Sequence, residues 1–336
     1  MSVSRRFSAV AFVGSLAFMA SCSSNTPTTS SLTSSPAVTQ KVTVILDWTP
    51  NTNHSGIYLA KAKGFYKDAG LDVTIIEPGA DGGLPQLEAG NAQFAITASE
   101  SLLPARAQGA KVVSVAAILQ HNTSSLIVPE DRGITSPKGL AGKTYGGFGG
   151  DLEKALVQKL VSCDGGDARS LKYVEIGNVD YNVGLQRKDY DAVWVFDGWD
   201  VLRLRNIEGM ELKTFPFYPS CVPDWYTPVL ATTESMILAK PEIVRAFVKA
   251  TAHGYELSRT DPKQAASTLL AAAPELDAKL VNASADYLAS RYADQGHPWG
   301  KQEVKVWKDF ASFLSDNKLL TVPINVNAVF TNDFLP

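Results

Sequence analysis

The chain has 336 residues, of which 45% are apolar and 19% are charged, with a formal net charge of −3. This length favours two domains, and the composition is globular, which excludes a disordered chain. Neither a basic excess nor a basic stripe is present, so a nucleic-acid partner is not indicated. Three cysteines are too few for a disulfide scaffold. Four scattered histidines lack zinc-ligand spacing, and we expect no metal.

The first residues have the features of an export signal. Two arginines precede an apolar run over residues 7–20, which is too short for a comfortable transmembrane helix. Small residues then lead to Cys22, an arrangement that resembles a bacterial lipobox, in which the cysteine is lipidated. Met19 stands where such motifs usually have leucine, and the alternative is an ordinary cleaved signal. We expect a lipoprotein signal peptide over residues 1–21 and an anchor at Cys22.

A tether follows the expected anchor. Residues 23–40 contain eleven Ser or Thr and two Pro, which cannot bury enough apolar surface to offset their ordering entropy. We expect residues 22–40 to link a lipid to a folded body outside the cytoplasmic membrane. That compartment is oxidising, so Cys163 and Cys221 either form a disulfide or remain buried thiols.

Strand and helix signals alternate along the first part of the folded body. Such alternation favours a mostly parallel sheet with helices on both faces. The expected strands cover residues 42–46, 71–76, 94–96 and 112–117, and the expected helices cover 55–67, 84–89 and 99–107.

A second α/β unit follows, and the chain then returns to the first. Its expected strands cover 143–145, 172–175 and 191–196, with a helix over 151–161. A strand over 228–232 returns to the first unit, and helices are expected over 241–258, 262–272, 277–287 and 302–317.

The chain therefore crosses twice between two units, which predicts a hinge with a cleft. We expect lobe 1 to comprise residues 41–132 and 228–336, and lobe 2 residues 133–227. Ligands of open α/β sheets bind beyond the carboxyl ends of the strands. The loops expected to carry the site are therefore 47–54, 97–100, 119–122, 146–153 and 197–200.

One of these loops carries a specific motif. The pattern Asp-Trp-x-Pro-Asn-x-x-His over residues 47–54, followed by Gly56, Tyr58 and Gly64-Phe65-Tyr66, resembles the extracytoplasmic binding proteins of ABC importers for thiamine pyrimidine precursors. The resemblance implies the periplasmic-binding-protein fold, type II-like, an α/β architecture with two doubly wound mixed sheets and a two-crossing hinge. It also implies a hydroxymethyl- or formylaminomethyl-pyrimidine ligand and an ABC permease as partner, and we expect a monomer.

The same fold is similar to a yeast-type enzyme that builds the pyrimidine from its own histidine and pyridoxal phosphate. That enzyme carries a lysine and a histidine in the segment that matches residues 95–101 here. This chain has Ala-Ile-Thr-Ala-Ser-Glu-Ser at those positions, so the lysine needed for a Schiff base is missing. We therefore expect a binding protein without a cofactor rather than an enzyme.

A flat aminopyrimidine needs an aromatic face and a few placed polar groups. Trp48 is the first candidate for that face, with core packing as the alternative. Asn51 can donate and accept hydrogen bonds at a pyrimidine edge, although Thr-Pro-Asn is also a turn composition. His54 either contacts the ligand or caps the following helix, and Asp47 either accepts from the exocyclic amine or fixes the loop.

The glycine-rich segment over residues 146–153 lies between a strand and a helix. Glycines let the backbone approach a ligand closely, and amides at a helix N-terminus favour polar groups. We expect Gly147, Phe148, Gly149 and Glu153 to cradle a formyl or hydroxyl substituent. The alternative is a tight turn with a capped helix.

The remaining candidates follow other strands. Asp197 is expected either to pair with the amine and ring nitrogen or to cap a helix. Trp199 or Tyr226 is expected to supply the second aromatic face, unless each is structural. Ser99 and Gln120, together with Glu100, are expected to complete the polar ring.

Two other solutes are alternative ligands for the same kind of binding protein. A sulfonate such as taurine needs an arginine or several amides at the cleft, and Arg106, Arg132 and Arg187 do not stand at strand ends. Riboflavin needs a wider cleft with more aromatic surface.

Overall fold

The computed structural model of the chain describes residues 39–79, 82–177 and 180–336. The expected signal peptide 1–21, the expected lipidation site Cys22 and nearly all of the expected tether 22–40 lie outside these residues. In the described part of the chain, no helix combines the length and apolar character needed to cross a bilayer.

The first sheet has five strands in the order β2-β1-β3-β10-β4. β1 pairs in parallel with β2 and β3, whereas β10 is antiparallel to β3 and β4, so the sheet is mixed. We call this sheet and its helices lobe 1. Its strands are β1 (Gln40–Ile45), β2 (Leu71–Ile76), β3 (Phe94–Thr97), β4 (Val112–Ala117) and β10 (Val229–Thr233).

The second sheet has five strands in the order β7-β6-β8-β5-β9. β6 is parallel to β7 and β8, and β5 is antiparallel to both β8 and β9. We call this sheet and its helices lobe 2. Its strands are β5 (Ser124–Pro129), β6 (Thr144–Gly147), β7 (Lys172–Glu175), β8 (Ala192–Phe196) and β9 (Leu212–Pro216).

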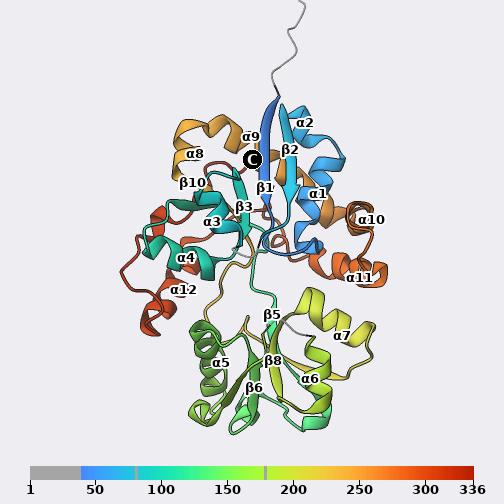
Figure 1. Cartoon of the computed structure of the whole chain (residues 1–336), viewed down its shortest axis with the longest axis vertical. Coiled ribbons are helices and arrows are strands. Elements are labelled where there is room, and N and C mark those ends of the chain that lie inside the picture. The colour runs from blue at the N-terminus through green and yellow to red at the C-terminus, as the bar shows by residue number, and fades with distance from the viewer. Residues whose placement is uncertain (1–38, 80–81, 178–179) are drawn as a thin grey trace, which may run out of the picture. The chain divides into compact units, whose positions relative to one another are not determined.

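Helices cover both faces of each sheet, as Figure 1 shows. In β5, Leu126 and Val128 pack into a cluster with the apolar face of α5, whereas Ile127 packs with residues of α6 and α7. This alternation follows from the two-residue repeat of a strand. The lobe 2 helices are α5 (Asp151–Cys163), α6 (Tyr181–Arg187) and α7 (Leu202–Asn206).

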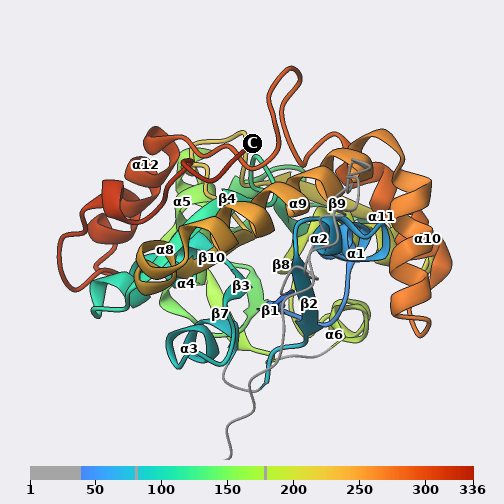
Figure 2. The same ribbon diagram turned by 90° about the horizontal axis from the view of Figure 1, so that it is seen from above.

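Lobe 1 contains the remaining helices. The longest, α9, runs across the sheet in Figure 2 and places Phe247 and Val248 in one cluster with the β1 residues Val42 and Val44. These helices are α1 (Ser55–Ala62), α2 (Phe65–Asp68), α3 (Gly83–Glu88), α4 (Ser99–Ala107), α8 (Glu234–Ala239), α9 (Pro241–Thr260), α10 (Pro262–Ala272), α11 (Ala278–Ala289) and α12 (Val304–Asp316).

The expected position of the first crossing between the sheets is wrong. β5 belongs to the second sheet, so the chain leaves lobe 1 between Ala117 and Ser124, earlier than the expected boundary after residue 132. The expectation relied on the prolines at 129 and 137, but strand pairing with β8 and β9 decides where β5 belongs. The chain returns between Pro216 and Val229, a range that contains the expected return.

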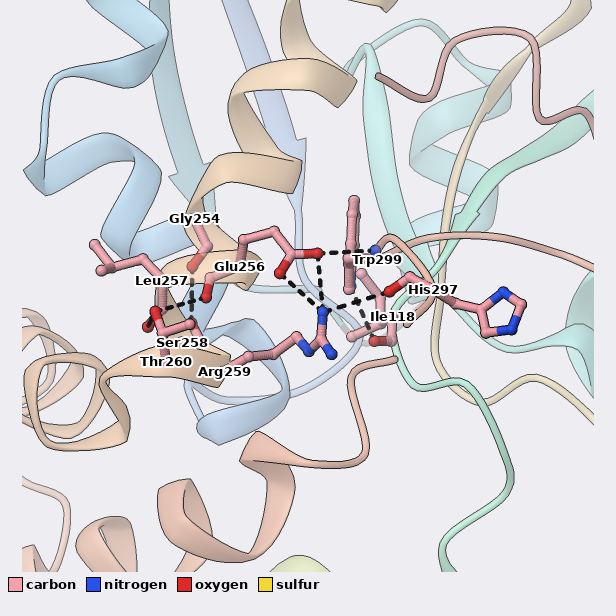
Figure 3. A network of polar contacts seen from close by, with 9 residues as sticks. All are labelled: Ile118, Gly254, Glu256, Leu257, Ser258, Arg259, Thr260, His297 and Trp299. Atoms are coloured by element: carbon pink, nitrogen blue, oxygen red, sulfur yellow. Dashed lines mark hydrogen bonds and ion pairs between the residues drawn. The ribbon is translucent and has the colours of Figure 1, made fainter. Parts of the chain in front are cut away.

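A hydrogen-bond network holds Ile118, the residue at which the first crossing begins. The carboxylate of Glu256 on α9 accepts a hydrogen bond from the Trp299 backbone N–H at 3.0 Å and one from Arg259 at 2.8 Å. The Trp299 indole N–H in turn donates to the Ile118 carbonyl oxygen at 3.1 Å. Figure 3 shows this network, which ties α9 to the residue that follows β4. Motion between the lobes is therefore expected beyond Ile118.

The helix that follows the motif loop, α1, packs closely on α9. A Cβ atom at Gly254 would lie 1.9 Å from the Gly56 carbonyl oxygen, so only glycine allows this approach. The expected single helix over 55–67 is broken at Gly64, whose positive φ of 81° separates α1 from α2. The close contact with α9 holds the N-terminus of α1, and therefore the motif loop before it, in a fixed place.

The structure also joins Cys163 to Cys221 in a disulfide. Cys163 ends α5, and Cys221 lies on the returning crossing. Of the two alternatives that the sequence left open, the structure therefore shows the pair. The bond links the far end of α5 to the segment that leads back to lobe 1.

Candidate functional site

The strand ends that carry the candidate residues lie beside the two crossings. Val229, where the chain re-enters lobe 1, pairs with Thr97 at the end of β3 and with Ala117 at the end of β4. Ser124, where the chain enters lobe 2, pairs with Phe196 at the end of β8. Because β1 is parallel to β3, and β6 to β8, their carboxyl ends lie at the same edges. We call these the hinge edges of the two sheets.

The motif loop after β1 is held by a buried histidine. The His54 side chain has no exposed surface, and its Nδ1 accepts a hydrogen bond from the Asn51 backbone N–H at 3.2 Å. Nε2 must therefore carry the proton, and it donates to Asp47 Oδ1 at 2.7 Å. His54 thus fixes Asp47, whose side chain remains 33% exposed.

Asn51 is used within the same loop. Its Oδ1 accepts from the Asn53 backbone N–H at 2.9 Å, and its Nδ2 donates to the Thr49 carbonyl oxygen at 3.0 Å. Asn51 thereby caps the short helix over 52–54, which corresponds to the turn alternative. Trp48, by contrast, is 55% exposed, so it is not part of the core.

The glycine-rich loop after β6 is held by a buried carboxylate. Glu153 Oε1 accepts from the Tyr145 hydroxyl at 2.5 Å, and Oε2 accepts from the Phe148 backbone N–H at 2.9 Å. A Cβ atom at Gly147 would lie 2.4 Å from Glu153 Oε1, so this position requires glycine. Gly149 has a positive φ of 84°, which also favours glycine. Glu153 therefore positions the loop, and the Phe148 ring is left 53% exposed.

Three exposed aromatic rings follow strands at the hinge edges. Among the exposed large apolar side chains of the described residues, the aromatic ones are Trp48, Phe148 and Phe196, the last at 41% exposure. They belong to the ends of β1, β6 and β8, so they come from both lobes. An exposed aromatic ring loses apolar contact with water when a flat ligand stacks on it. The set therefore suits a planar, ring-containing ligand.

Polar groups without hydrogen-bond partners lie at the hinge edge of lobe 1. Glu100 and Ser99 open α4, directly after β3, and within the described chain neither Glu100 Oε2 nor Ser99 Oγ has a hydrogen-bond partner. Burial raises the pKa of Glu100 to about 7, although its own backbone N–H and the nearby polar groups of Thr227 and Trp225, which favour the charged carboxylate, oppose that shift. The nearby charge of Asp47 raises it further.

A second carboxyl group lies at the hinge edge of lobe 2. Asp197 Oδ2 accepts from the Ser125 hydroxyl at 3.0 Å, and its N–H donates to the Thr123 carbonyl oxygen. Burial raises the pKa of Asp197 to about 6, and the positive charge of Arg291 opposes this shift. Arg291 belongs to lobe 1 and follows α11, so this charge pair spans the two lobes.

Two of the expected aromatic contacts are used in packing. Tyr226 is buried against Trp307, and its hydroxyl oxygen accepts from the Glu303 backbone N–H at 2.8 Å. Trp199 packs against a cluster of α10 and α11 residues, which brings lobe 2 against lobe 1. Gln120 is buried and donates to the Lys301 carbonyl oxygen at 3.3 Å. Tyr226 and Trp199 are thus used in packing, whereas Gln120 Oε1 has no hydrogen-bond partner among the described residues.

The sequence interpretation missed Trp194, Phe196 and Trp225. The Trp194 and Trp225 rings meet edge to face at 6.2 Å, between β8 and the returning crossing. Neither indole N–H has a partner among the residues that the structure describes. No sequence signal marked them, because tryptophans in apolar runs usually belong to a core. In the same described residues, no group of three His, Cys, Asp or Glu side chains is arranged to hold a metal ion.

Comparison with known proteins assigns the chain to a family. Residues 51–265 match the family described as NMT1/THI5 like, which is more than half of the chain. The chain belongs to the NMT1/THI5-like family. The family match begins within the motif loop and includes the glycine-rich loop, Glu100 and both crossings.

Proteins with similar sequences are named either as binding proteins or as synthases. The formylaminopyrimidine-binding protein of Halalkalibacterium halodurans is 26% identical, covering 98% of this chain and 99% of that protein. The riboflavin-binding protein RibY of Chloroflexus aurantiacus is 26% identical over 94% and 93%. A 4-amino-5-hydroxymethyl-2-methylpyrimidine phosphate synthase of Legionella pneumophila is 23% identical over 88% and 92%.

Solved structures confirm the two-lobed fold. The periplasmic aliphatic sulphonate binding protein SsuA of Escherichia coli matches with a TM-score of 0.66 at 14% identity, covering 88% of this chain and 92% of that one. At this identity the likeness concerns the fold, which is the periplasmic-binding-protein fold expected from the sequence. The relatives thus include proteins named as binding proteins and as synthases, so the function has to be argued from the residues of the site.

Proposed function

We propose that this protein binds a small thiamine pyrimidine precursor outside the cytoplasmic membrane and delivers it to an ABC permease. The observation that carries the proposal is the set of exposed rings at the hinge edges, Trp48 of lobe 1 and Phe148 and Phe196 of lobe 2. Stacking on one aromatic ring contributes about 1–3 kcal/mol for a base-sized ligand. A flat ligand between the lobes can therefore gain stacking energy from the rings of both lobes.

The mechanism is closure about the two crossings. A ligand shifts an equilibrium between open and closed forms only through contacts that differ between them. Rings on both lobes meet that requirement, because both can touch one ligand only when the lobes are together. In this proposal the closed form is the one that the permease receives, and Cys22 anchors the protein to the membrane as a monomer.

The residue composition of α4 also supports a binding role. The helix Ser99–Ala107 contains no lysine that could form a Schiff base with pyridoxal phosphate. The similarity to a synthase from Legionella pneumophila makes this alternative worth testing. A stable new absorbance band after pyridoxal phosphate is added to the purified protein would support the enzyme.

An anionic solute such as taurine is a second candidate, favoured by Arg291. Its charge acts on Asp197 across the lobes, so it is a cation at the cleft. Two of the three arginines considered from the sequence form ion pairs elsewhere: Arg106 pairs with Glu234 at 2.5 Å, and Arg132 pairs with Asp131 at 2.7 Å. The carboxyl groups of Asp47 and Glu100 at the hinge edge of lobe 1, and of Asp197 at that of lobe 2, disfavour an anion and so favour the neutral pyrimidine.

Tryptophan fluorescence titration of the purified protein tests the proposal. The ligands are formylaminomethyl-pyrimidine, hydroxymethyl-pyrimidine, thiamine, riboflavin and taurine. Saturable quenching by a pyrimidine at submicromolar concentration, with no response to taurine, is the expected result. Binding of riboflavin or taurine with silence for both pyrimidines would keep the binding-protein mechanism and overturn the proposed ligand.

A further inference from the structure

Glu100 is a partly buried acid, one of whose carboxyl oxygens has no contact with solvent. It lies in the first turn of α4, where the helix dipole favours a negative charge, but that benefit needs no burial. Its Oε2 is buried and lacks a partner in the described part of the chain. A buried polar atom without a hydrogen bond costs about 1–3 kcal/mol. Such a cost is tolerated where a ligand supplies the missing partner.

The surroundings of Glu100 belong to both the motif loop and the hinge. Asp47, which raises the pKa of Glu100, lies on the loop that presents Trp48. Thr227 and Trp225, which lower it, lie on the returning crossing. These two side chains therefore lie close to the Glu100 carboxyl group. Glu100 therefore lies between the motif loop of lobe 1 and the returning crossing.

We infer that Glu100 hydrogen-bonds the edge of the ligand ring that carries an exocyclic amine beside a ring nitrogen. One carboxyl oxygen accepts from the amine N–H, and the other donates its proton to the ring nitrogen. A protonated carboxyl offers this donor and acceptor side by side, as the ring edge requires. The inference rests on the proposed function and assigns ligand selection to Glu100, which the sequence analysis did not include among the principal contacts.

The same geometry explains why an anion is disfavoured. A negative charge on Glu100 is already disfavoured by burial and by the charge of Asp47, and an incoming sulfonate would add a negative charge at the same wall of the site. Like charges at close range in a partly buried site raise the free energy of binding. A neutral amino-heteroaromatic ring meets no such repulsion, and it satisfies the partnerless oxygen.

The contact makes binding depend on pH. The complex holds one shared proton, whichever partner carries it, so affinity falls when both partners have lost their protons. The charged group that faces Glu100 is Asp47, which is bonded to His54 behind it; the returning crossing contributes the uncharged Thr227 and Trp225. Since burial raises the pKa of Glu100 to about 7, affinity is expected to fall above neutral pH, by up to about tenfold per pH unit.

Two substitutions and one ligand analogue test the inference. Glu100→Leu removes the donor and acceptor, and is expected to weaken aminopyrimidine binding by about 10–100-fold, a typical loss for a buried hydrogen-bonded contact. The analogue that lacks the amine keeps only the contact to the ring nitrogen, so it should bind the wild type more weakly and lose less affinity with Glu100→Leu than the aminopyrimidine does. Glu100→Gln restores a donor and an acceptor, so it should bind more tightly than Glu100→Leu and lose the pH dependence.

The outcomes separate this inference from the proposed function. If the wild type binds no aminopyrimidine, the proposed function fails. If the wild type binds but Glu100→Leu binds within about twofold, the inference about Glu100 fails while the proposed function stands. Glu100→Leu should leave the urea midpoint unchanged or raise it, because it removes a buried polar group. Should that variant not fold, the amine-free analogue and the pH profile of Glu100→Gln decide.

Discussion

The motif loop of lobe 1 and the glycine-rich loop of lobe 2 are each held in place by a buried polar side chain, but the two side chains differ in chemistry. Each presents one exposed aromatic ring, Trp48 at 55% and Phe148 at 53% exposure. The first is held by the neutral His54, which leaves part of the Asp47 carboxylate open to solvent. The second is held by Glu153, whose two oxygens are both used within the loop.

This difference shows which polar residues remain available to a ligand. Asp47 has a second oxygen and a third of its surface exposed, so it can contact both His54 and a ligand. Glu153 is buried, with a hydrogen bond to each oxygen, so it acts through the ring that it positions. In these two loops, a polar residue of the motif therefore serves either as a support for an aromatic ring or as an exposed group that a ligand can contact.

The largest expected effect comes from removing the rings. Trp48→Ala and Phe148→Ala should each weaken pyrimidine binding by about 10–100-fold, because each loses a stacking surface. Both side chains are exposed, so the free energy of unfolding should change little. Leu238→Ala, at an 82% exposed position on α8, is the matched control. Affinity is measured by isothermal titration calorimetry.

The double variant asks whether the two loops share one ligand. If Trp48 and Phe148 stack on opposite sides of the same ring, their combined loss should differ from the sum of the single losses. Strict additivity, or affinity within twofold of the wild type for Trp48→Ala, would contradict a shared aromatic site.

The sequence predicted most elements of the fold but not the site. β2, α4 and β4 match their expected bounds, because each has a clear periodicity between turn residues. β5 was missed, because its run Ser-Ser-Leu-Ile-Val-Pro is buried throughout and gains its identity from distant pairing with β8 and β9. Local patterns do not contain that information.

The limits at the site have a similar cause. The motif marked the right loop, but it did not show that Asn51 and His54 bond within the loop. Glu100 stands in the first turn of a helix, where acids are common, so its burial and partnerless oxygen were visible only in three dimensions. Spacing identifies candidate loops, whereas hydrogen bonds decide which side chains are left for a ligand.

A smaller effect, on the free energy of unfolding, distinguishes Glu153 from Asp47. Glu153→Ala leaves the Tyr145 hydroxyl and the Phe148 N–H without their acceptor, and should lower the free energy of unfolding by about 1–3 kcal/mol. Asp47→Ala removes one acceptor at a partly exposed site, where water replaces it, and should cost less than about 1 kcal/mol. Urea denaturation measures both.

The ligand affinity of a double variant then tests how Glu153 acts. If it works only by placing the Phe148 ring, Glu153→Ala in a Phe148→Ala background should cause no further loss of affinity. A full additional loss would mean that Glu153 contacts the ligand itself, and the contrast between the two loops would disappear.

The smallest effect concerns the crossings that connect the two loops. His121, on the first crossing, lies 2.5 Å from Asp224 on the returning crossing and 3.3 Å from Asp294 of lobe 1. The hydrogen bond to Asp224 raises the pKa of His121, followed by the charges of Asp224 and Asp294, while burial opposes it. Tyr218 stacks on the ring at 4.5 Å, and Lys305 and Asp309 line the same pocket.

The raised pKa fixes the direction of the pH dependence. Protonated His121 stabilises the fold, and this contribution is complete below the unfolded pKa of about 6.5 and is lost as pH rises through the higher folded value. His121→Gln should therefore lower the urea midpoint most at acidic pH, with the difference shrinking toward alkaline pH. A difference that stays constant across that range would show that the two crossings are linked by packing rather than by charge. The aromatic loops would then be coupled through a hinge that does not respond to pH, and any pH dependence of affinity would belong to Glu100.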